Sequence, residues 1–155
     1  WAPDGSLILS ASITNYDGAI STYLPAGLYK VDKNFTSVTA IGSGLTIPQF
    51  PSVSPDGTKI SFEMNSHIWV IGMDGTGQKQ VTTGPNSETY SDWSPDGSEI
   101  ATVSYGDVGL SAGNSMAIIS SNPSTPTTVS PSASVWVQDK NNGGLLNPQG
   151  NVSWK

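Results

Sequence analysis

A Pro-Asp-Gly motif occurs three times in this chain, each time just before a run of apolar residues. The three strings are "WAPDGSLILSAS" at 1–12, "SVSPDGTKISFEM" at 52–64 and "DWSPDGSEIATVS" at 92–104. Their prolines, Pro3, Pro55 and Pro95, are 52 and 40 positions apart. An active site needs different groups that converge, so a string used three times indicates a repeating structural unit. The sequence therefore predicts a repeat protein.

Each unit is expected to contain four short strands. Apolar and polar residues alternate in "KISFEM" and "HIWVIGM", a period of two that is typical of strands, and no stretch has a helical period. In "SPDG" the proline presets φ for a type I turn, and the glycine can take the left-handed conformation that closes a hairpin. The third unit keeps this register through "MAIISSNPSTPTTVS", where Ala117 matches Trp69 and Val129 matches Val81.

The string WSPDG-x-x-I, an apolar strand and then "HIWVIGMDGTGQKQVTTG" resemble the repeat of TolB-like propellers. The resemblance is close over 54–97, good over 1–53 apart from its insertion, and loose over 98–155. Val53 stands at the Trp position, and "SSNPS" replaces the Asp-Gly turn. It implies an all-β fold, a β-propeller segment of about three four-stranded antiparallel blades.

The whole chain, 1–155, is expected to be a single propeller segment. Its repeat units run approximately over 1–52, 53–92 and 93–153, and 150–155 starts the next blade. Propellers typically close with four to eight blades, so three blades leave two open sheet faces. We therefore expect the segment to belong to a larger propeller or to an oligomeric assembly.

The repeated residues are interpreted as structural. The resemblance implies that the Trp-bearing strand is the innermost of each blade, so that its indole fills space between adjacent blades and buries ~150–250 Å². The turn aspartates are expected to accept backbone N–H bonds, and the glycines to close the turns. The structural residues are Trp1, Asp4, Gly5, Asp56, Gly57, Trp93, Asp96, Gly97 and Trp154.

Composition excludes several classes of partner. The chain has six lysines, no arginine and a net charge of -6, whereas nucleic acids and anionic membranes are bound by clustered basic residues. No apolar run approaches the ~20 residues of a membrane span. Cysteine is absent, which excludes disulfides and thiolate metal sites. The low charged fraction, 12%, and the many serines and threonines favour a location outside the cytoplasm, periplasmic or secreted.

No catalytic site is predicted. "GLSAG" at 109–113 matches a nucleophile elbow formally, but no helix follows it and the only histidine, His67, comes earlier in the chain. We interpret His67 as an ordinary residue at a strand end. The carboxylates Glu63, Glu88 and Glu99 are interpreted as surface groups. No metal site is predicted; calcium is left open at "NYDG" (15–18) or "DKNN" (139–142), although neither has the full series of ligands.

Three insertions point to a binding surface. They span residues 13–27, 105–115 and 132–149, each at a connection between strands two and three or between blades. In an antiparallel blade these connections share one end of the sheet. Binding residues concentrate in loops on a rigid scaffold. The candidates on this loop face are Tyr16, Asp17, Tyr23, Tyr105, Asp107, Trp136, Asp139, Asn141 and Asn142.

The sequence thus favours a non-catalytic propeller module outside the cytoplasm that binds a protein, a glycan or further copies of itself. One alternative is the accessory propeller of an enzyme such as a prolyl-oligopeptidase-like peptidase, whose catalytic domain would lie outside this chain. Another is a structural subunit of an extracellular assembly. Fold alone does not decide between these functions.

Overall fold

The computed structural model describes residues 1–11, 24–105, 115–129 and 134–135. Every regular element in these ranges is a β-strand, and no helix occurs among them. The strands are β1 (Leu7–Ala11), β2 (Gly27–Val31), β3 (Val38–Ile41), β4 (Gln49–Val53), β5 (Lys59–Met64), β6 (His67–Gly72), β7 (Lys79–Gln80), β8 (Thr82–Thr83), β9 (Ser87–Trp93), β10 (Glu99–Tyr105), β11 (Ser115–Ser120), β12 (Thr127–Thr128) and β13 (Ser134–Val135). The all-β prediction is confirmed.

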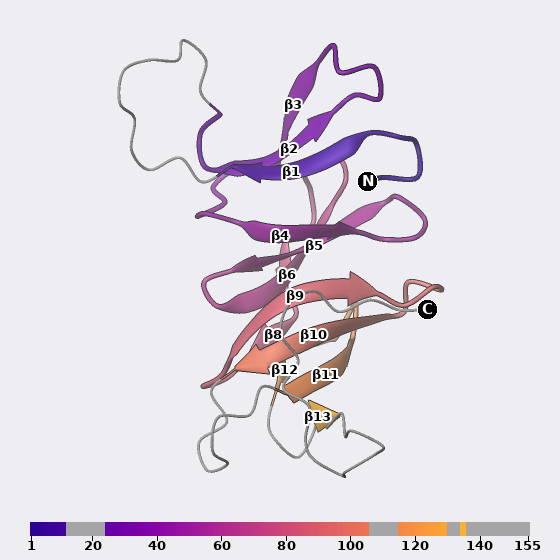
Figure 1. The fold of residues 1–155 in the computed structure, drawn as a ribbon. Coiled ribbons are helices and arrows are strands. Elements are labelled where there is room, and N and C mark those ends of the chain that lie inside the picture. Colours follow the sequence, from indigo (N-terminus) through magenta and orange to yellow (C-terminus); the bar gives the residue numbers. More distant parts are fainter. Residues whose placement is uncertain (12–23, 106–114, 130–133, 136–155) are drawn as a thin grey trace, which may run out of the picture.

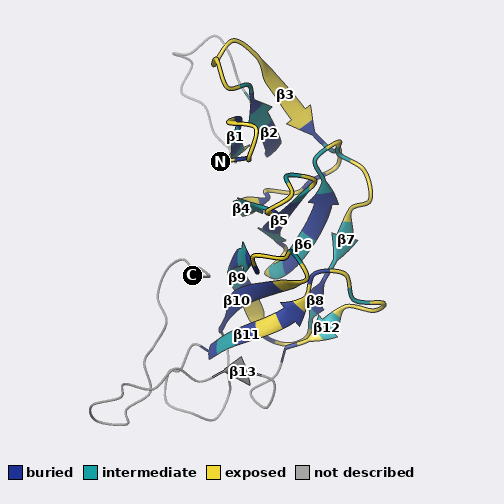
Figure 2. Ribbon diagram, turned by 90° about the vertical axis from the view of Figure 1, so that its right-hand side faces the viewer, coloured by how far each residue is buried: buried dark blue, intermediate teal, exposed yellow. Residues whose placement is uncertain are grey.

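Three antiparallel sheets lie one above another along the molecule (Figure 1). The first sheet has the order β1-β2-β3, the second β4-β5-β6-β7, and the third β9-β10-β11-β13. In the view turned by 90°, β4 and β9 lie along one edge of the stack and β3, β7 and β12 along the other (Figure 2). The sheets are therefore arranged like successive blades, with β4 and β9 as their inner strands.

The Pro-Asp-Gly turns have the predicted geometry. The amide of Gly57 donates to the carbonyl of Ser54 at 2.8 Å, and Gly57 has a φ of 72°. The Asp56 carboxylate accepts hydrogen bonds from the Thr58 amide at 3.0 Å and from the Ser54 hydroxyl at 2.7 Å. The corresponding bonds recur in the next turn. These bonds, led by that from Ser54, lower the pKa of Asp56 to about 2.

The third unit pairs its last strand differently from the second unit, although Val129 is buried as its match Val81 is. Thr127 and Thr128 of β12 pair in parallel with Thr82 and Thr83 of β8, so this strand bridges two sheets. The outer partner of β11 is instead the short strand β13. Val129 is fully buried between the second and third sheets, together with Val81.

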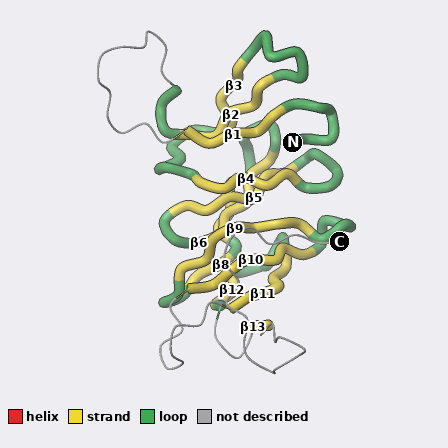
Figure 3. The backbone as a smooth tube through the Cα atoms, viewed as in Figure 1, coloured by secondary structure: helices red, strands yellow, loops and turns green. Residues whose placement is uncertain are grey.

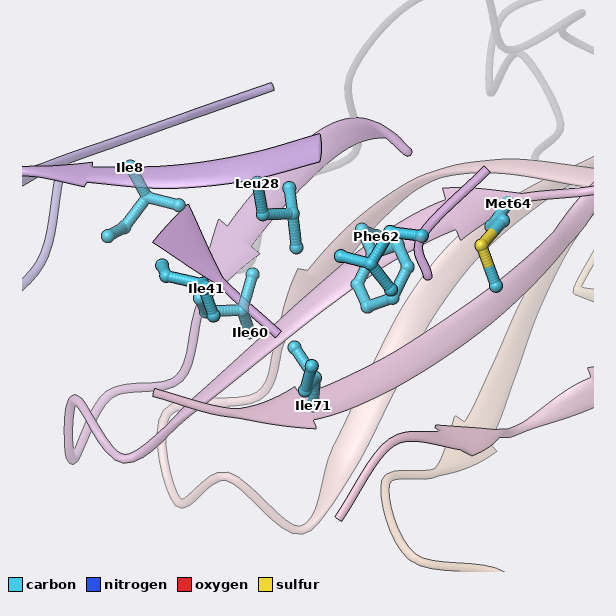
Figure 4. Packing of buried hydrophobic residues seen from close by; sticks show 8 residues of the cluster. Ile8, Leu28, Ile41, Ile60, Phe62, Met64 and Ile71 are labelled. Atoms are coloured by element: carbon cyan, nitrogen blue, oxygen red, sulfur yellow. The ribbon is translucent and has the colours of Figure 1, made fainter. Parts of the chain in front are cut away.

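Alternation along β5 and β6 builds two cores. Ile60, Phe62 and Met64 face the first sheet, where they pack with Ile8, Leu28, Ile41 and Ile71 (Figure 4). Ile68 and Val70 face the third sheet and pack with Val81, Trp93, Ile100 and Ala117. The second sheet is thus buried on both faces. Burial of a side chain the size of Phe62 contributes about 1.5–3 kcal/mol.

The three repeated tryptophans have different surroundings. Trp93 is 4% exposed and lies between the second and third sheets, where its Nε1 donates to the Ser52 carbonyl at 3.1 Å. Trp1, expected between blades as well, is 74% exposed. The structure therefore does not bury Trp1 between blades as expected, and its ring lies edge-on to that of Phe35, with the centroids 6.2 Å apart. Trp154 lies outside the described residues.

Candidate functional site

The sheets have two distinct ends, which Figure 3 shows on opposite sides of the molecule. The Pro-Asp-Gly turns (2–6, 54–58 and 94–98) lie at what we call the turn end. At the opposite end, the loop end, β1 stops at Ala11, β10 stops at Tyr105, and Asn65 and Ser66 join β5 to β6. The described strand ends that flank the first two insertions therefore share the loop end.

Most residues of the predicted loop face lie outside the described part of the chain. These residues are Tyr16, Asp17, Tyr23, Asp107, Trp136, Asp139, Asn141 and Asn142. Both calcium candidates and "GLSAG" also lie outside the described part. Tyr105 is described and is half-buried rather than freely exposed. Burial raises the pKa of its phenol, and the neighbouring charges of Tyr90 and Glu63 raise it further. These three side chains therefore belong to one neighbourhood.

The main feature that the sequence analysis did not anticipate is a pair of aromatic rings on the inner strands. Phe50 and Tyr90 occupy equivalent positions in successive units, each three residues before the Trp position of its strand. Their ring centroids are 4.4 Å apart and their planes are inclined by 47°. Phe50 is 41% exposed and Tyr90 is half-buried, so the pair presents ring surface to solvent.

Both aromatic residues have strained backbones. Phe50 has a φ of 48° and Tyr90 a φ of 52°, in the left-handed region that bulky L-residues rarely adopt. Each lies in an irregularity of its strand, between Gln49 and Ser52 in β4 and between Thr89 and Asp92 in β9. A residue held this way costs about 1–3 kcal/mol, and a bulge re-aims its side chain. The strain is thus located where the two rings meet.

Polar contacts hold β4 and β9 side by side next to this pair. The Ser52 hydroxyl donates to the Asp92 carboxylate at 3.2 Å, and the Ser91 hydroxyl donates to that of Ser61 at 2.8 Å. Trp93 adds its bond to the Ser52 carbonyl. Two of these contacts join β9 to β4, and the Ser91–Ser61 bond joins β9 to β5, so the rings of Phe50 and Tyr90 are held in a set arrangement.

Glu88 corrects a second interpretation, that the glutamates are surface groups. Its side chain is fully buried near the start of β9, where Oε2 lies 2.8 Å from Nδ1 of His67. Oε1 accepts a long hydrogen bond of 3.4 Å from Ser104, and the Glu88 amide donates to the Ser66 carbonyl at 2.8 Å. Burial raises the pKa of Glu88, against the opposing effect of the hydrogen bond to His67. Glu63 is half-buried and Glu99 is exposed.

The contacts among His67, Glu88 and Ser104 join strands near the loop end, but they are not arranged for catalysis. Nucleophilic catalysis by serine needs the imidazole between the hydroxyl and the carboxylate. Here Ser104 and His67 contact different oxygens of the same carboxylate. The network instead ties β9 to the turn that contains Ser66. Within the described ranges no group of three His, Cys, Asp or Glu residues could hold a metal ion.

A groove of about 820 Å³ opens at the turn end, lined by residues of 57–59, 70–79 and 121–122. Its polar groups are largely occupied by one another. The Lys79 amine donates to Oδ1 of Asn122 at 3.0 Å and to the Pro123 carbonyl, and Asp74 accepts from the Thr76 amide at 3.0 Å. The groove also lies opposite the described strand ends that flank the first two insertions. The aromatic pair is therefore the stronger candidate site.

Comparison with solved structures supports the fold. The chain is similar to a structure described as "putative TolB from Agrobacterium tumefaciens", with a TM-score of 0.62 and 21% sequence identity. The match covers 78% of this chain and 44% of that chain, so this chain corresponds to less than half of its length. The likeness concerns the fold, and it confirms the prediction of a β-propeller segment.

Searches by sequence found no counterpart. No family model matches the chain. No curated protein matches it either. Among the described residues, no helix is long and apolar enough to cross a membrane.

Proposed function

We propose that this chain is a non-catalytic interaction module that binds a partner protein or a glycan through its loop end. The observation that carries the proposal is the Phe50–Tyr90 pair. Two equivalent residues of neighbouring blades keep strained backbones and a shared, partly exposed ring surface. Strain of this kind persists where the surrounding structure holds it, and it clusters at ligand-binding sites.

The surroundings of the pair fit recognition better than chemistry. Aromatic rings supply large contact area at low entropic cost, and they are enriched where proteins meet their partners. The polar groups next to the pair, Ser52, Asp92 and Trp93, are engaged with one another. The polar groups of His67, Glu88 and Ser104 are likewise engaged with one another. We infer a rigid platform, with the inserted loops of the same end adding further contacts.

We place this module outside the cytoplasm, in the periplasm or secreted. The support is compositional: the chain has few charged residues and is rich in serine and threonine. The alternative of an enzyme's accessory propeller would require a catalytic domain elsewhere in a longer protein. Sequencing of the gene on both sides distinguishes the two, since a hydrolase domain downstream would favour the enzyme.

The loop-end proposal can be tested by ligand selection. The immobilised chain is exposed to a random peptide library and to a glycan array, and each ligand recovered is then measured on two variants. Phe50→Asn removes one ring of the aromatic pair, while Lys33→Ala changes the turn end. We expect Phe50→Asn to weaken binding about ten-fold and Lys33→Ala to leave it unchanged. Ligands insensitive to Phe50→Asn, or no ligand at all, would overturn the proposal.

A second candidate, association with further copies or with a larger assembly, is favoured by the first sheet. Trp1, Phe35 and Val38 are 74%, 63% and 51% exposed, and all three lie on or beside this sheet. Exposed apolar groups gathered in one region mark interaction surfaces. We expect sedimentation of the chain to show concentration-dependent association that Val38→Asp abolishes. A monodisperse monomer at all concentrations would exclude this candidate.

A further inference from the structure

The described charges are divided unevenly between the two ends. All four described lysines lie near the Pro-Asp-Gly turns. Lys30 pairs with Asp4 at 2.8 Å, Lys33 lies beside Gly5, and Lys59 and Lys79 line the groove with Gly57. At the loop end stand Glu63 and the buried Glu88, and none of the described lysines. The Glu88 carboxylate lies against His67, so Glu63 is the carboxylate at this end that no described basic residue offsets.

Glu63 is the carboxylate available to a ligand at this end. It is half-buried, it pairs across the sheet with Gln49, the residue before Phe50, and its charge acts on Tyr105. The side chains of β5 at this position and at Ser61 face β9, where Ser61 contacts Ser91. Among the described residues no lysine or histidine forms an ion pair with Glu63.

Two rings form an aromatic surface, and a third lies on the neighbouring strand. The centroids of Phe50 and Tyr90 are 4.4 Å apart with planes inclined by 47°, and Tyr105 of β10 pairs with Ser87 of β9, the strand that carries Tyr90. The face of an aromatic ring carries negative electrostatic potential and attracts a cation within about 6 Å of its centre. Two adjoining rings near a carboxylate with no described basic partner are complementary to a flat or compact cation with an apolar stem, and arginine and lysine side chains have this form.

We propose that the loop end binds a cationic side chain, arginine in particular, of a partner protein, with the guanidinium over the Phe50–Tyr90 rings and Glu63 as its counter-charge. This inference rests on the proposed function and names the ligand class of that same site. A neutral sugar also stacks on aromatic rings, but it gains nothing from the uncompensated carboxylate. The acidic chain as a whole, with a net charge of -6, attracts the same class of partner.

The test uses two peptides that differ only in charge, acetyl-Gly-Arg-Gly amide and acetyl-Gly-citrulline-Gly amide. Citrulline has the shape and the hydrogen-bonding groups of arginine but carries no charge. Binding is followed by NMR through the ring resonances of Phe50, Tyr90 and Tyr105. We expect the arginine peptide to bind at least about five-fold more tightly, and only its binding to weaken as salt rises. Equal affinities of the two peptides, or shifts confined to other residues, would overturn the proposal.

Three variants locate the binding. Glu63→Gln keeps the size of the side chain and should reduce the preference for arginine to about two-fold or less. Phe50→Asn and Tyr90→Asn remove a ring but suit the left-handed backbone, since asparagine tolerates it, so the fold should be retained. Both variants should bind the arginine peptide more weakly than the unmodified chain, while Lys33→Ala should bind it equally well. An unchanged indole resonance of Trp93 confirms that each variant is folded.

Failure here and failure of the proposed function are distinguishable. The library can yield ligands that carry no cation, while the arginine and citrulline peptides bind with equal affinity. That outcome would leave the proposed interaction module supported and would contradict the proposal of a cationic ligand. A glycan that shifts the Phe50 and Tyr90 resonances where neither peptide does would have the same meaning. If no ligand of any class depends on Phe50, both proposals fall.

Discussion

Nδ1 of His67 lies 2.8 Å from Oε2 of Glu88, which joins the first residue of β6 to the beginning of β9 across the interface of two sheets. Glu88 is fully buried, while the His67 side chain is 18% exposed. The imidazole of His67 therefore reaches solvent, while the carboxylate of Glu88 lies in the interior. Removing either partner has a consequence that can be measured.

We expect His67→Ala to destabilise the fold by about 1–3 kcal/mol, because Glu88 would lose its closest partner while staying buried. His67→Gln is the matched control, since its amide can still donate to the carboxylate and should restore part of the loss. Urea unfolding monitored by tryptophan fluorescence measures both. Equal stability of His67→Ala and the unmodified chain would show that water replaces the imidazole without cost.

Glu88 also predicts a dependence of stability on pH. Burial raises its pKa above the ordinary value of 4.5, so the folded state binds this proton more tightly than the unfolded state does. Its contribution is complete below 4.5 and is lost as pH rises through the native pKa. The unmodified chain should therefore lose stability relative to Glu88→Gln as pH rises above this value. A difference that stays constant with pH would contradict the direction of the shift.

Local patterns account for what the sequence could predict. The Pro-Asp-Gly turns depend on a few adjacent residues, and alternation in 59–64 and 67–73 depends on the two faces of one strand, so both are readable in the string. The burial of Glu88 is not local. It results from Ser104 and His67, which neighbouring strands bring to it from 16 and 21 positions away.

The aromatic pair could be predicted in part. Phe50 and Tyr90 fall at the same position of the repeat, and that equivalence was available in the alignment of Val53 with Trp93. Their left-handed backbone conformations could not be predicted, because bulky residues in an apolar strand favour extended geometry. The exposure of Trp1 depends on which strands lie beside it, and the motif around it is the same as around buried Trp93.

The two tryptophans give a matched test of the cores. Trp93→Ala should cost about 3–5 kcal/mol, because it opens a cavity between the second and third sheets and removes the bond to Ser52. Trp1→Ala should change stability by no more than about 0.5 kcal/mol, since that side chain is 74% exposed. Thermal unfolding of the two variants checks this. Similar losses at both positions would mean that Trp1 is buried in solution, as in an assembly.

Gly75 marks a close approach between the first and second sheets. A Cβ at this position would lie 2.5 Å from the amide nitrogen of Gly42, and the φ of Gly75 is +81°. Gly77 has a φ of +66° but open space around it, so Gly77→Ala should cost about 1 kcal/mol for the backbone alone. Gly75→Ala should cost about 1–3 kcal/mol more, because backbone must move. Equal losses would show that the two turns separate without cost.

Asp96 predicts a pH dependence opposite to that of Glu88. The hydroxyl of Ser94 and the amide of Ser98 donate to its Oδ1 at 2.7 and 3.0 Å. Led by Ser94, these bonds lower the pKa of Asp96 from 3.8 to about 2, so the folded state holds the proton less tightly than the unfolded state does. The stabilisation is complete above 3.8 and is lost as pH falls towards 2.

Asp96→Asn should therefore be less stable than the unmodified chain at pH 5, and the difference should disappear near pH 2. Ser94→Ala is the companion variant, because it removes the leading hydrogen bond and should raise the pKa of Asp96 towards its ordinary value. The first turn has an alanine, Ala2, at this position, so the turn itself forms without the serine. Urea unfolding from pH 2 to pH 6 measures the difference for both variants. If the difference in free energy of unfolding between Asp96→Asn and the unmodified chain persists at pH 2, the carboxylate acts through packing and not through its charge.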